Sequence, residues 1–295
     1  MKPSPVGILG GSGLYRMAGL QVQDERELQT PFGAPSDRYV LGELHGRPVA
    51  FLSRHGQGHR LMPSELNYRA NIFGFKLLGV ERIVSLSAVG SMKEDLRPTD
   101  IVVVDQFIDR TRHRPDTFFG DGLVAHVSFA DPVCPQLAGL FVGCGRAAGA
   151  KVQEGGTYLC MEGPQFSTRA ESRLYRQWGV DVIGMTNLQE AKLAREAEIC
   201  YATLALVTDY DCWHEEEEDV NVSSVLEALR RNAATAQDVV GRVVESLPAE
   251  RTCGCGSALE HALITDPAAV SDASLERLRP LVGRYFPNRS TTSTS

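Results

Sequence analysis

Residues 204–213 read Leu-Ala-Leu-Val-Thr-Asp-Tyr-Asp-Cys-Trp, an apolar run that ends in two acidic residues, Asp209 and Asp211, among aromatic side chains. The apolar run predicts a buried β-strand. Residues i and i+2 of an extended segment point the same way, so the two carboxylates are expected to leave the strand end side by side. Crowded carboxylates in a poorly solvated cleft resist losing both protons, so one of them can stay protonated near neutral pH.

A carboxyl pair of this kind can donate one hydrogen bond and accept another. Those two interactions suit a 6-aminopurine, whose N7 must be protonated or hydrogen bonded as the base leaves and whose exocyclic amine is a donor. A metal-ligand pair and a solvated strand end are alternatives that this segment leaves open by itself.

Short apolar strands alternate with longer amphipathic segments along the rest of the chain, which is typical of an α/β fold. The predicted strands are residues 6–9, 39–44, 49–53, 83–87, 101–104, 156–160, 182–184 and 201–207, and the predicted helices are residues 64–78, 135–148, 168–178, 188–196, 222–247 and 273–286. Asn187 and Glu190 have the capping-box spacing and predict the start of the fourth helix. One domain over residues 1–287 is expected, with a helical extension from about residue 248 and a disordered tail at 288–295.

Composition restricts the possible partners. With 295 residues, of which 43% are hydrophobic and 23% charged, the chain has enough material for one large core. A formal charge of −7 argues against nucleic acid as a partner, although locally concentrated cations could still bind an anionic small molecule. We find no apolar signal-peptide segment and no stretch of membrane-spanning length, so a cytoplasmic location away from membranes is expected.

Seven cysteines, several of them inside apolar runs, are typical of a protein with reduced thiols. Cys253 and Cys255 flank a single glycine in a Cys-Gly-rich segment, and two reduced thiols are expected there in a reducing compartment. A zinc site would need two further ligands, and His261 is a candidate for only one of them.

Four predicted strand ends carry groups that suit an anion. Strand 6–9 leads into Gly-Gly-Ser-Gly with Ser12, strand 49–53 ends in Arg54 and His55, strand 83–87 ends in small residues from Ser87 onward, and strand 182–184 ends at Thr186 before a helix. The first loop lacks the third glycine of G-x-G-x-x-G and the Lys-Ser/Thr of a P-loop. Each strand end could be only a tight turn, but ligands of open α/β sheets gather at strand carboxyl ends. Together they predict a site for inorganic phosphate beside a purine nucleoside.

Over residues 1–245, several longer motifs resemble the methylthioadenosine phosphorylases, which belong to the trimeric purine nucleoside phosphorylases. The motifs are Gly10-Gly-Ser-Gly, Thr30-Pro-Phe-Gly with Pro35-Ser-Asp, Arg54-His-Gly, Met62-Pro-Ser with Asn67-Tyr-Arg-Ala-Asn, Asp105-Gln-Phe-Ile-Asp-Arg-Thr, Glu162-Gly-Pro-Gln-Phe-Ser-Thr-Arg-Ala-Glu-Ser and Thr208-Asp-Tyr-Asp-Cys-Trp. The resemblance implies a single-domain phosphorylase-type α/β fold with a central mixed sheet flanked by helices.

The resemblance also implies a reaction and an assembly. The reaction is the reversible conversion of 5′-methylthioadenosine and phosphate to adenine and 5-methylthioribose 1-phosphate, with no metal or organic cofactor. The assembly is a homotrimer or a dimer of such trimers. In some microbial members a Cys-x-Cys pair forms a disulfide, which is the implied alternative for Cys253 and Cys255.

Carried over by position, the resemblance implies a set of site residues. The phosphate ligands are Ser12, Arg54, His55, Ser87, Ala88 and Thr186, where related members often have Thr in place of Ser12 and Ser87. Phe166 and Ser167 line the base, Met185 lines the ribose, Asp209 binds N7 as the catalytic acid, and Asp211 binds the 6-amino group. The methylthio pocket is formed by Val222, Val225 and Leu226, with His126 supplied by the neighbouring subunit.

Alternatives remain for the pocket and for the activity. The i, i+3, i+4 spacing of Val222, Val225 and Leu226 is also that of a helix packed on the core, and His126 could be an ordinary surface histidine. A phosphorylase acting on 6-oxopurine nucleosides or methylthioinosine is the closest rival, but an amide would be expected at position 209. A nucleoside-binding protein without catalysis is the more distant rival.

Overall fold

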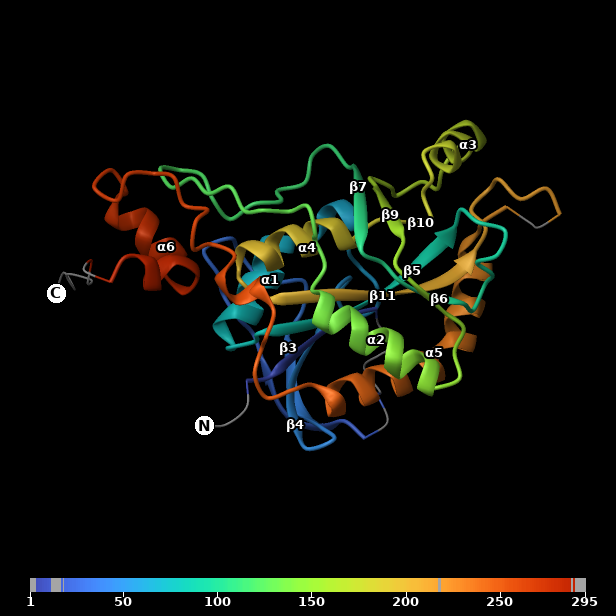
Figure 1. The fold of residues 1–295 in the computed structure, drawn as a ribbon, viewed down its shortest axis with the longest axis horizontal. Helices are drawn as coiled ribbons and strands as arrows, with labels where there is room; N and C mark the ends of the chain where they lie inside the picture. The colour runs from blue at the N-terminus through green and yellow to red at the C-terminus, as the bar shows by residue number, and fades with distance from the viewer. Residues whose placement is uncertain (1–3, 12–16, 18, 217–218, 288, 290–295) are drawn as a thin grey trace.

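The computed structural model describes residues 4–11, 17, 19–216, 219–287 and 289 of the chain. Within these residues eleven strands form one sheet (Figure 1). The strands are β1 (Val6–Gly10), β2 (Gln21–Arg26), β3 (Tyr39–Leu44), β4 (Arg47–Ser53), β5 (Arg82–Ser91), β6 (Ile101–Val103), β7 (Gln106–Arg110), β8 (Val152–Glu154), β9 (Thr157–Met161), β10 (Val182–Gly184) and β11 (Cys200–Asp209). Both parallel and antiparallel pairs occur, which confirms the mixed sheet.

The helices follow the sequence prediction with small shifts. They are α1 (Tyr68–Leu77), α2 (Pro135–Ala147), α3 (Arg169–Gln177), α4 (Asn187–Glu196), α5 (Val222–Ser246) and α6 (Asp272–Val282), with 3₁₀ turns η2 (Pro63–Glu65), η3 (Gly254–Ser257) and η4 (Gly283–Tyr285). The first predicted helix is too long, because Asn67 caps α1 by accepting a hydrogen bond from the N–H of Ala70. Residues 63–65 instead form the separate turn η2.

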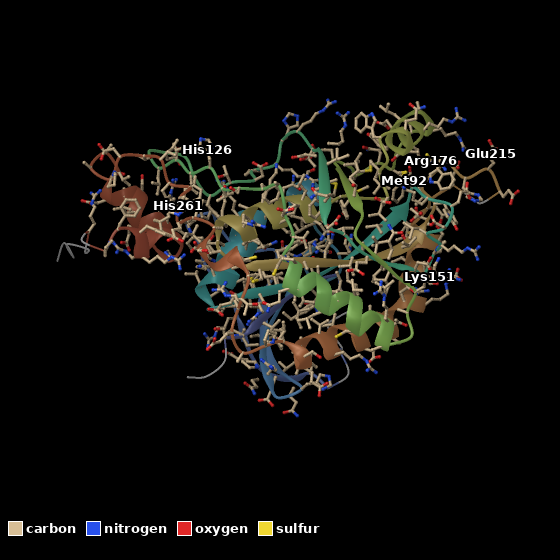
Figure 2. The ribbon with its side chains drawn as sticks, viewed as in Figure 1. Met92, His126, Lys151, Arg176, Glu215 and His261 are labelled. Atoms are coloured by element: carbon tan, nitrogen blue, oxygen red, sulfur yellow. The ribbon has the colours of Figure 1, made fainter. Side chains whose placement is uncertain are left out.

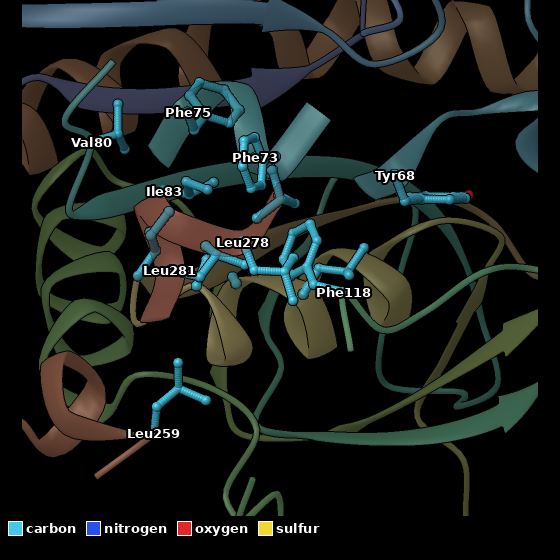
Figure 3. Packing of buried hydrophobic residues seen from close by; sticks show 14 of the residues in the cluster. Tyr68, Phe73, Phe75, Val80, Ile83, Phe118, Leu259, Leu278 and Leu281 are labelled. Carbon is cyan, nitrogen blue, oxygen red and sulfur yellow. The ribbon is translucent and has the colours of Figure 1, made fainter. Parts of the chain in front are cut away.

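Helices cover both faces of the sheet, and alternate residues of each central strand pack against the helices on opposite faces. Helices α2 and α5 pack on one face of β11, and α4 packs on the other beside α1 (Figure 1). Ile8 joins the α2/α5 core, whereas Leu9 joins the α1/α4 core. Figure 3 shows the second of these cores, which contains Phe73 and Phe75 of α1 together with Leu278 and Leu281 of α6. Burial on both faces explains why the central strands have continuous apolar sequences.

The edge of β5 is interrupted in a way that creates space for a ligand. β1 pairs in parallel with residues 82–85 of β5, β10 pairs antiparallel with residues 90–91, and β11 occupies the opposite edge of β5. The carboxyl ends of β1 and β10 therefore converge on the same edge. Between them, residues 86–89 have no strand partner on that edge within the described part of the chain. This interval, the β5 gap, is where backbone groups can face a ligand.

The chain after α5 forms a helical extension that packs on the remainder of the domain. Helix α6 contacts α1, and the buried carboxylate of Glu198 accepts hydrogen bonds from the N–H of Leu259 (3.0 Å) and the guanidinium of Arg284 (2.6 Å). Of the predicted disordered tail, residues 288 and 290–295 lie outside the described residues. Among the helices that the structure describes, each is too short or too polar to span a membrane.

Candidate active site

Arg54 lies buried beside the β5 gap and makes a dense set of hydrogen bonds. Its Nε pairs with Glu190, its Nη2 donates to Glu190 (3.0 Å) and to Ser85 Oγ (2.8 Å), and its Nη1 donates to the carbonyl of Leu86 (2.8 Å). Arg has five N–H donors, so among the described residues one Nη1 donor remains for an anion. Leu86 is the first residue of the gap, which places that donor at its edge.

The charge of Arg54 is fixed by its partner. Burial acts to lower the pKa of Arg54, but the charge of Glu190 and their hydrogen bonds outweigh it and raise the pKa. A buried ion pair is stable only with good geometry and further hydrogen bonds, and here the Tyr201 hydroxyl also donates to Glu190 (2.8 Å). The predicted phosphate ligand is therefore a permanent cation held rigidly in position.

The helix after β10 is capped differently from the prediction. Its N-cap is Thr186, whose side chain makes no capping hydrogen bond. The predicted capping box of Asn187 and Glu190 is wrong, because both side chains turn into the core: Asn187 Nδ2 donates to the Tyr201 hydroxyl (2.7 Å), and Glu190 binds Arg54. The buried Thr186 hydroxyl and the first N–H groups of α4 can therefore serve an anion near the end of β10.

His55 is neutral at physiological pH. Burial, assisted by the charge of Arg54, lowers the pKa of His55 to about 4. Its Nδ1 lies 2.8 Å from the Leu61 carbonyl and its ring stacks on His59. Since Nδ1–H donates to that carbonyl, Nε2 is an acceptor. A contact with phosphate would thus use the backbone N–H of His55 or a protonated phosphate oxygen.

The remaining predicted phosphate ligands divide into two groups. Ser87 and Ala88 lie inside the β5 gap, and the Ser87 hydroxyl lies 3.3 Å from the Ala88 carbonyl. Ser12 lies outside the described residues, although β1, which leads to it, ends at Gly10 beside the same gap. Arg54, Ser87, Ala88 and the end of β10 with Thr186 are therefore brought together around one short interval of β5.

Asp209 is the last residue of β11 and is paired with Gly90, two residues beyond Ala88. A Cβ atom at Gly90 would lie only 2.8 Å from Asp209 Oδ1, so glycine leaves room for the carboxylate. Asp209 accepts hydrogen bonds from the Thr208 hydroxyl (2.6 Å) and the Asp211 N–H (2.8 Å). Burial nevertheless raises the pKa of Asp209, which favours a protonated carboxyl that can donate to a ligand.

Asp211 does not leave the strand by the expected i, i+2 geometry, although its carboxylate still lies close enough to Asp209 that burial and the Asp209 charge together raise the pKa of Asp211. β11 ends at Asp209 with a bulge between Val207 and Asp209, and Asp211 follows with a positive φ of 55°. The i, i+2 rule applies only to continuous extended backbone. Asp211 instead receives hydrogen bonds from the side chains of Ser167 and Ser172, but burial outweighs them and raises its pKa. These contacts tie the Asp211 carboxylate to the segment that carries Ser167.

The expected base and ribose residues lie around this turn. The Cys212 thiol donates to the Ser167 carbonyl (3.3 Å), which joins the segment of Ser167 to the Asp211 turn. Phe166 has 39% of its surface exposed and is available to stack on a flat ring. Met185 directly precedes Thr186, and its sulfur would lie 2.5 Å from a Cβ atom at Gly163.

Sequence reasoning missed Arg114, which organises this side of the site. Its buried guanidinium donates to the carbonyls of Met185 and Glu162 (2.6 Å to the latter), to the Tyr68 hydroxyl (3.1 Å) and to Gln189 Oε1 (3.2 Å). Arg114 therefore holds Met185 and the residue-162 segment in place. No strand end or motif spacing marks it, and its partners are far apart in sequence.

The three apolar residues at the start of α5 are not core residues. Val222 and Leu226 have 64% and 47% of their surface exposed, and Val225 is half-buried. A helix packed on the core would bury this i, i+3, i+4 face. The exposed strip is available for a ligand or another chain.

His126 is exposed and lies in a surface hollow with Phe119, Lys192 and Glu196. Figure 2 shows His126 far from Met92 and Arg176. The Arg176 guanidinium donates a hydrogen bond to the Met92 carbonyl, just after the end of β5. Val222, Val225 and Leu226 of the exposed strip of α5 are not among the residues that line the His126 hollow, so the two predicted sets are not joined there.

Anion donors gather at the β5 gap, and the buried carboxyl of Asp209, whose pKa is raised by burial, lies beside them. This combination defines an anion- and base-binding site of the kind found at strand carboxyl ends of α/β enzymes. Comparison with known proteins gives the family. Residues 5–245 match the family described as Phosphorylase superfamily, and the chain belongs to that family.

Individual relatives are similar over nearly the whole chain. An S-methyl-5′-thioadenosine phosphorylase of Koribacter versatilis is 59% identical over 281 residues, covering 95% of this chain and 96% of the relative. A crystal structure of a methylthioadenosine phosphorylase from an Antarctic soil metagenomic library superposes with a TM-score of 0.90 and 52% identity, covering 95% of this chain and 99% of that one. An S12T mutant of the Schistosoma mansoni adenosine/methylthioadenosine phosphorylase, in complex with methylthioadenosine, has a TM-score of 0.80 and 36% identity, with 84% and 92% coverage.

Proposed function

We propose that this protein is an enzyme that catalyses the reversible phosphorolysis of S-methyl-5′-thioadenosine to adenine and 5-methylthioribose 1-phosphate. The near full-length similarity to S-methyl-5′-thioadenosine phosphorylases, such as the 59% identical protein of Koribacter versatilis, carries this function. The arrangement of Arg54 and Asp209 on the two sides of the β5 gap supports it independently. Such a reaction serves purine and methionine salvage.

The proposed mechanism is a single displacement. Phosphate, held by Arg54, the N-terminus of α4 and the residues of the β5 gap, lies beneath the anomeric carbon. As the C–N bond loosens, its electron pair moves to the base and the sugar becomes oxocarbenium-like. A phosphate oxygen then forms the new C–O bond with inversion. The phosphate anion also stabilises the positive sugar, so no covalent enzyme nucleophile is needed.

Asp209 is the proposed acid for the leaving base. Because its pKa is raised, the Asp209 carboxyl can donate a proton or a strong hydrogen bond to purine N7. Negative charge grows at that nitrogen as the C–N bond breaks. Asp211, on the side of Ser167, would accept from the 6-amino group. Protein groups and phosphate supply all of these steps, so we propose that neither a metal nor an organic cofactor takes part in the reaction.

The proposal extends to assembly and partners. His126 lies on the hollow with Lys192 and Glu196, away from Asp209, so it reaches a methylthio pocket only in a neighbouring subunit. We propose a homotrimer, alone or paired into a hexamer, in which the exposed strip of α5 meets this histidine. The proposed location is the cytoplasm, with small-molecule substrates and without membrane or nucleic-acid partners.

Phosphate dependence tests the activity directly. Adenine release from methylthioadenosine is measured with and without added phosphate, beside inosine as the competing substrate. We expect release only with phosphate, and hypoxanthine release from inosine at a much lower rate. A preference for inosine would assign the protein to the 6-oxopurine phosphorylases instead, and binding without turnover would make it a nucleoside-binding protein.

Val225→Asp tests the methylthio pocket. If Val222, Val225 and Leu226 line it, a charge there should reduce turnover of methylthioadenosine more than that of adenosine, because an apolar group in such a pocket contributes about 1–3 kcal/mol. Steady-state kinetics on both nucleosides measure the ratio.

The matched control is Ser223→Asp, which places the same charge in the same first turn of α5 but outside the strip. Equal losses on both nucleosides in the Val225→Asp variant would mean that the strip serves only contact between subunits.

A further inference from the structure

Four cysteine side chains meet at the end of β11 opposite Asp209. The sulfur atoms of Cys134, Cys200, Cys253 and Cys255 all lie within 4.8 Å of one another, and those of Cys200 and Cys253 are 3.3 Å apart. Three of the four residues are buried, and Cys253 is half-buried. We call this group the thiol cluster. Its members come from three separate segments of the chain, so only folding brings them together.

The geometry of the thiol cluster fits a tetrahedral metal ion. A point equidistant from four atoms at such spacings lies roughly 2–3 Å from each, which brackets the Zn–S distance of about 2.3 Å. Four sulfur ligands in a tetrahedral arrangement are characteristic of zinc or iron. Four protein ligands leave no open coordination position, and closed sites of this kind have structural roles.

We propose that the thiol cluster binds one structural Zn²⁺ ion through its four cysteine sulfurs. Ordered backbone holds the two core ligands: the N–H of Cys134 donates to the Tyr201 carbonyl (2.9 Å), and that of Cys200 donates to the Glu81 carbonyl (2.9 Å). The other two ligands flank Gly254 at the start of η3. Ligands on ordered elements keep the site preformed, which strengthens metal binding.

Neighbouring groups offset the negative charge of a zinc tetrathiolate. Cys134 is the N-cap of α2, so its sulfur lies at the positive end of that helix. The guanidinium of Arg251 lies against Gly256, where a Cβ atom would be 2.9 Å from its Nη2. Arg251 is held there by a hydrogen bond to the Glu198 carbonyl (2.8 Å). The helix N-terminus thus lies at Cys134, and Arg251, which also pairs with Glu81 (3.4 Å), lies next to the residue after Cys255.

The zinc ion would join the C-terminal extension to the sheet and would not take part in phosphorolysis. Cys200 and Asp209 are the two ends of β11, roughly 30 Å apart at the usual rise of a strand. Cys253 and Cys255 follow the residues matched by the Phosphorylase superfamily. His261, the ligand that the sequence suggested, is exposed and is not a member of the cluster.

Metal content tests the proposal on the full chain, purified without a histidine tag from zinc-supplemented medium. Mass spectrometry of the metals should find about one zinc per chain after dialysis. A mercurial thiol reagent should release it as the cluster thiols react. Cobalt substitution should give the intense visible bands of a tetrahedral thiolate site. Much less than one zinc per chain, or iron or copper in its place, would overturn the assignment. Alkylation would then show whether the four cysteines are free thiols or form two disulfides, and either result contradicts a zinc site.

The double variant Cys253→Ser/Cys255→Ser tests the ligands. It should lose the zinc and unfold at least about 5 °C lower than wild type, while phosphorolysis at room temperature persists. Cys144→Ser is the control, because Cys144 lies on α2 outside the cluster, and it should keep both zinc and thermal midpoint. Zinc retained at wild-type stoichiometry in the double variant would refute the site.

Discussion

Arg54→Ala should nearly abolish phosphorolysis and raise the phosphate concentration needed for half-maximal rate. The substitution removes the Nη1 donor at the β5 gap, and it also leaves the Glu190 carboxylate buried without its partner. Charged hydrogen bonds are each worth about 1.5–3 kcal/mol, and breaking a buried ion pair costs about 3–5 kcal/mol of stability. Phosphate titrations of the initial rate, together with thermal unfolding, measure the two effects.

A second variant separates binding from folding. Arg54→Met combined with Glu190→Leu replaces the ion pair by apolar side chains of similar length, which often restores stability. We expect this double variant to fold like wild type and still to lack phosphate-dependent turnover. An unchanged half-saturating phosphate concentration in either variant would show that the anion binds elsewhere.

Asp209→Asn should lower turnover of methylthioadenosine by roughly 10²- to 10⁴-fold, the usual contribution of general acid catalysis. An amide cannot protonate N7, and its NH₂ group would face the 6-amino group donor to donor. The fold should tolerate the change, because the Thr208 hydroxyl can turn to the Val89 carbonyl, which it already approaches at 3.2 Å. The relative preference for 6-oxopurines should rise, since an amide can donate to a 6-oxygen.

The pH dependence gives a second readout for Asp209. Since burial raises the pKa of Asp209, the protonated fraction persists above the usual range of a carboxyl and is lost as the pH rises through that pKa. The wild-type rate should carry this descending limb and the Asp209→Asn variant should not. Asp238→Asn, at an exposed position of α5, is the control with unchanged kinetics. Wild-type selectivity between adenine and hypoxanthine nucleosides in the Asp209→Asn variant would mean that this residue does not recognise the base.

The sequence predicted the central strands well because their signal is local. β3 and β10 have the predicted bounds, and the other predicted strands differ by a few residues, since continuous apolar runs bounded by turns are characteristic of strands buried on both faces. β2 was missed because its six residues are all exposed and mostly polar. β7 and β8 are short and partly exposed, so their sequences resemble loops.

The parts of the site that sequence reasoning missed depend on long-range contacts. Arg54 pairs with Glu190, which is 136 residues away in the sequence. Glu190 also lies three residues after Asn187, which is the spacing of a capping box, so the sequence suggested a local role for it. The direction of Asp211 depends on a bulge and a left-handed residue that periodicity does not encode. The thiol cluster combines three segments, and only its Cys-x-Cys part is visible in the sequence.

In the proposed site, the β5 gap and the start of α5 would form two walls of different stiffness at the two ends of a bound nucleoside. The gap belongs to central strands whose backbone and side chains are buried on both faces, so moving it would disrupt the shared core. The first turns of α5 keep much of their apolar surface in solvent, and displacing them sacrifices few buried contacts. If both assignments hold, the rigid gap would fix the position of the glycosidic bond, and movement of the start of α5 would let the methylthio-sugar enter and leave.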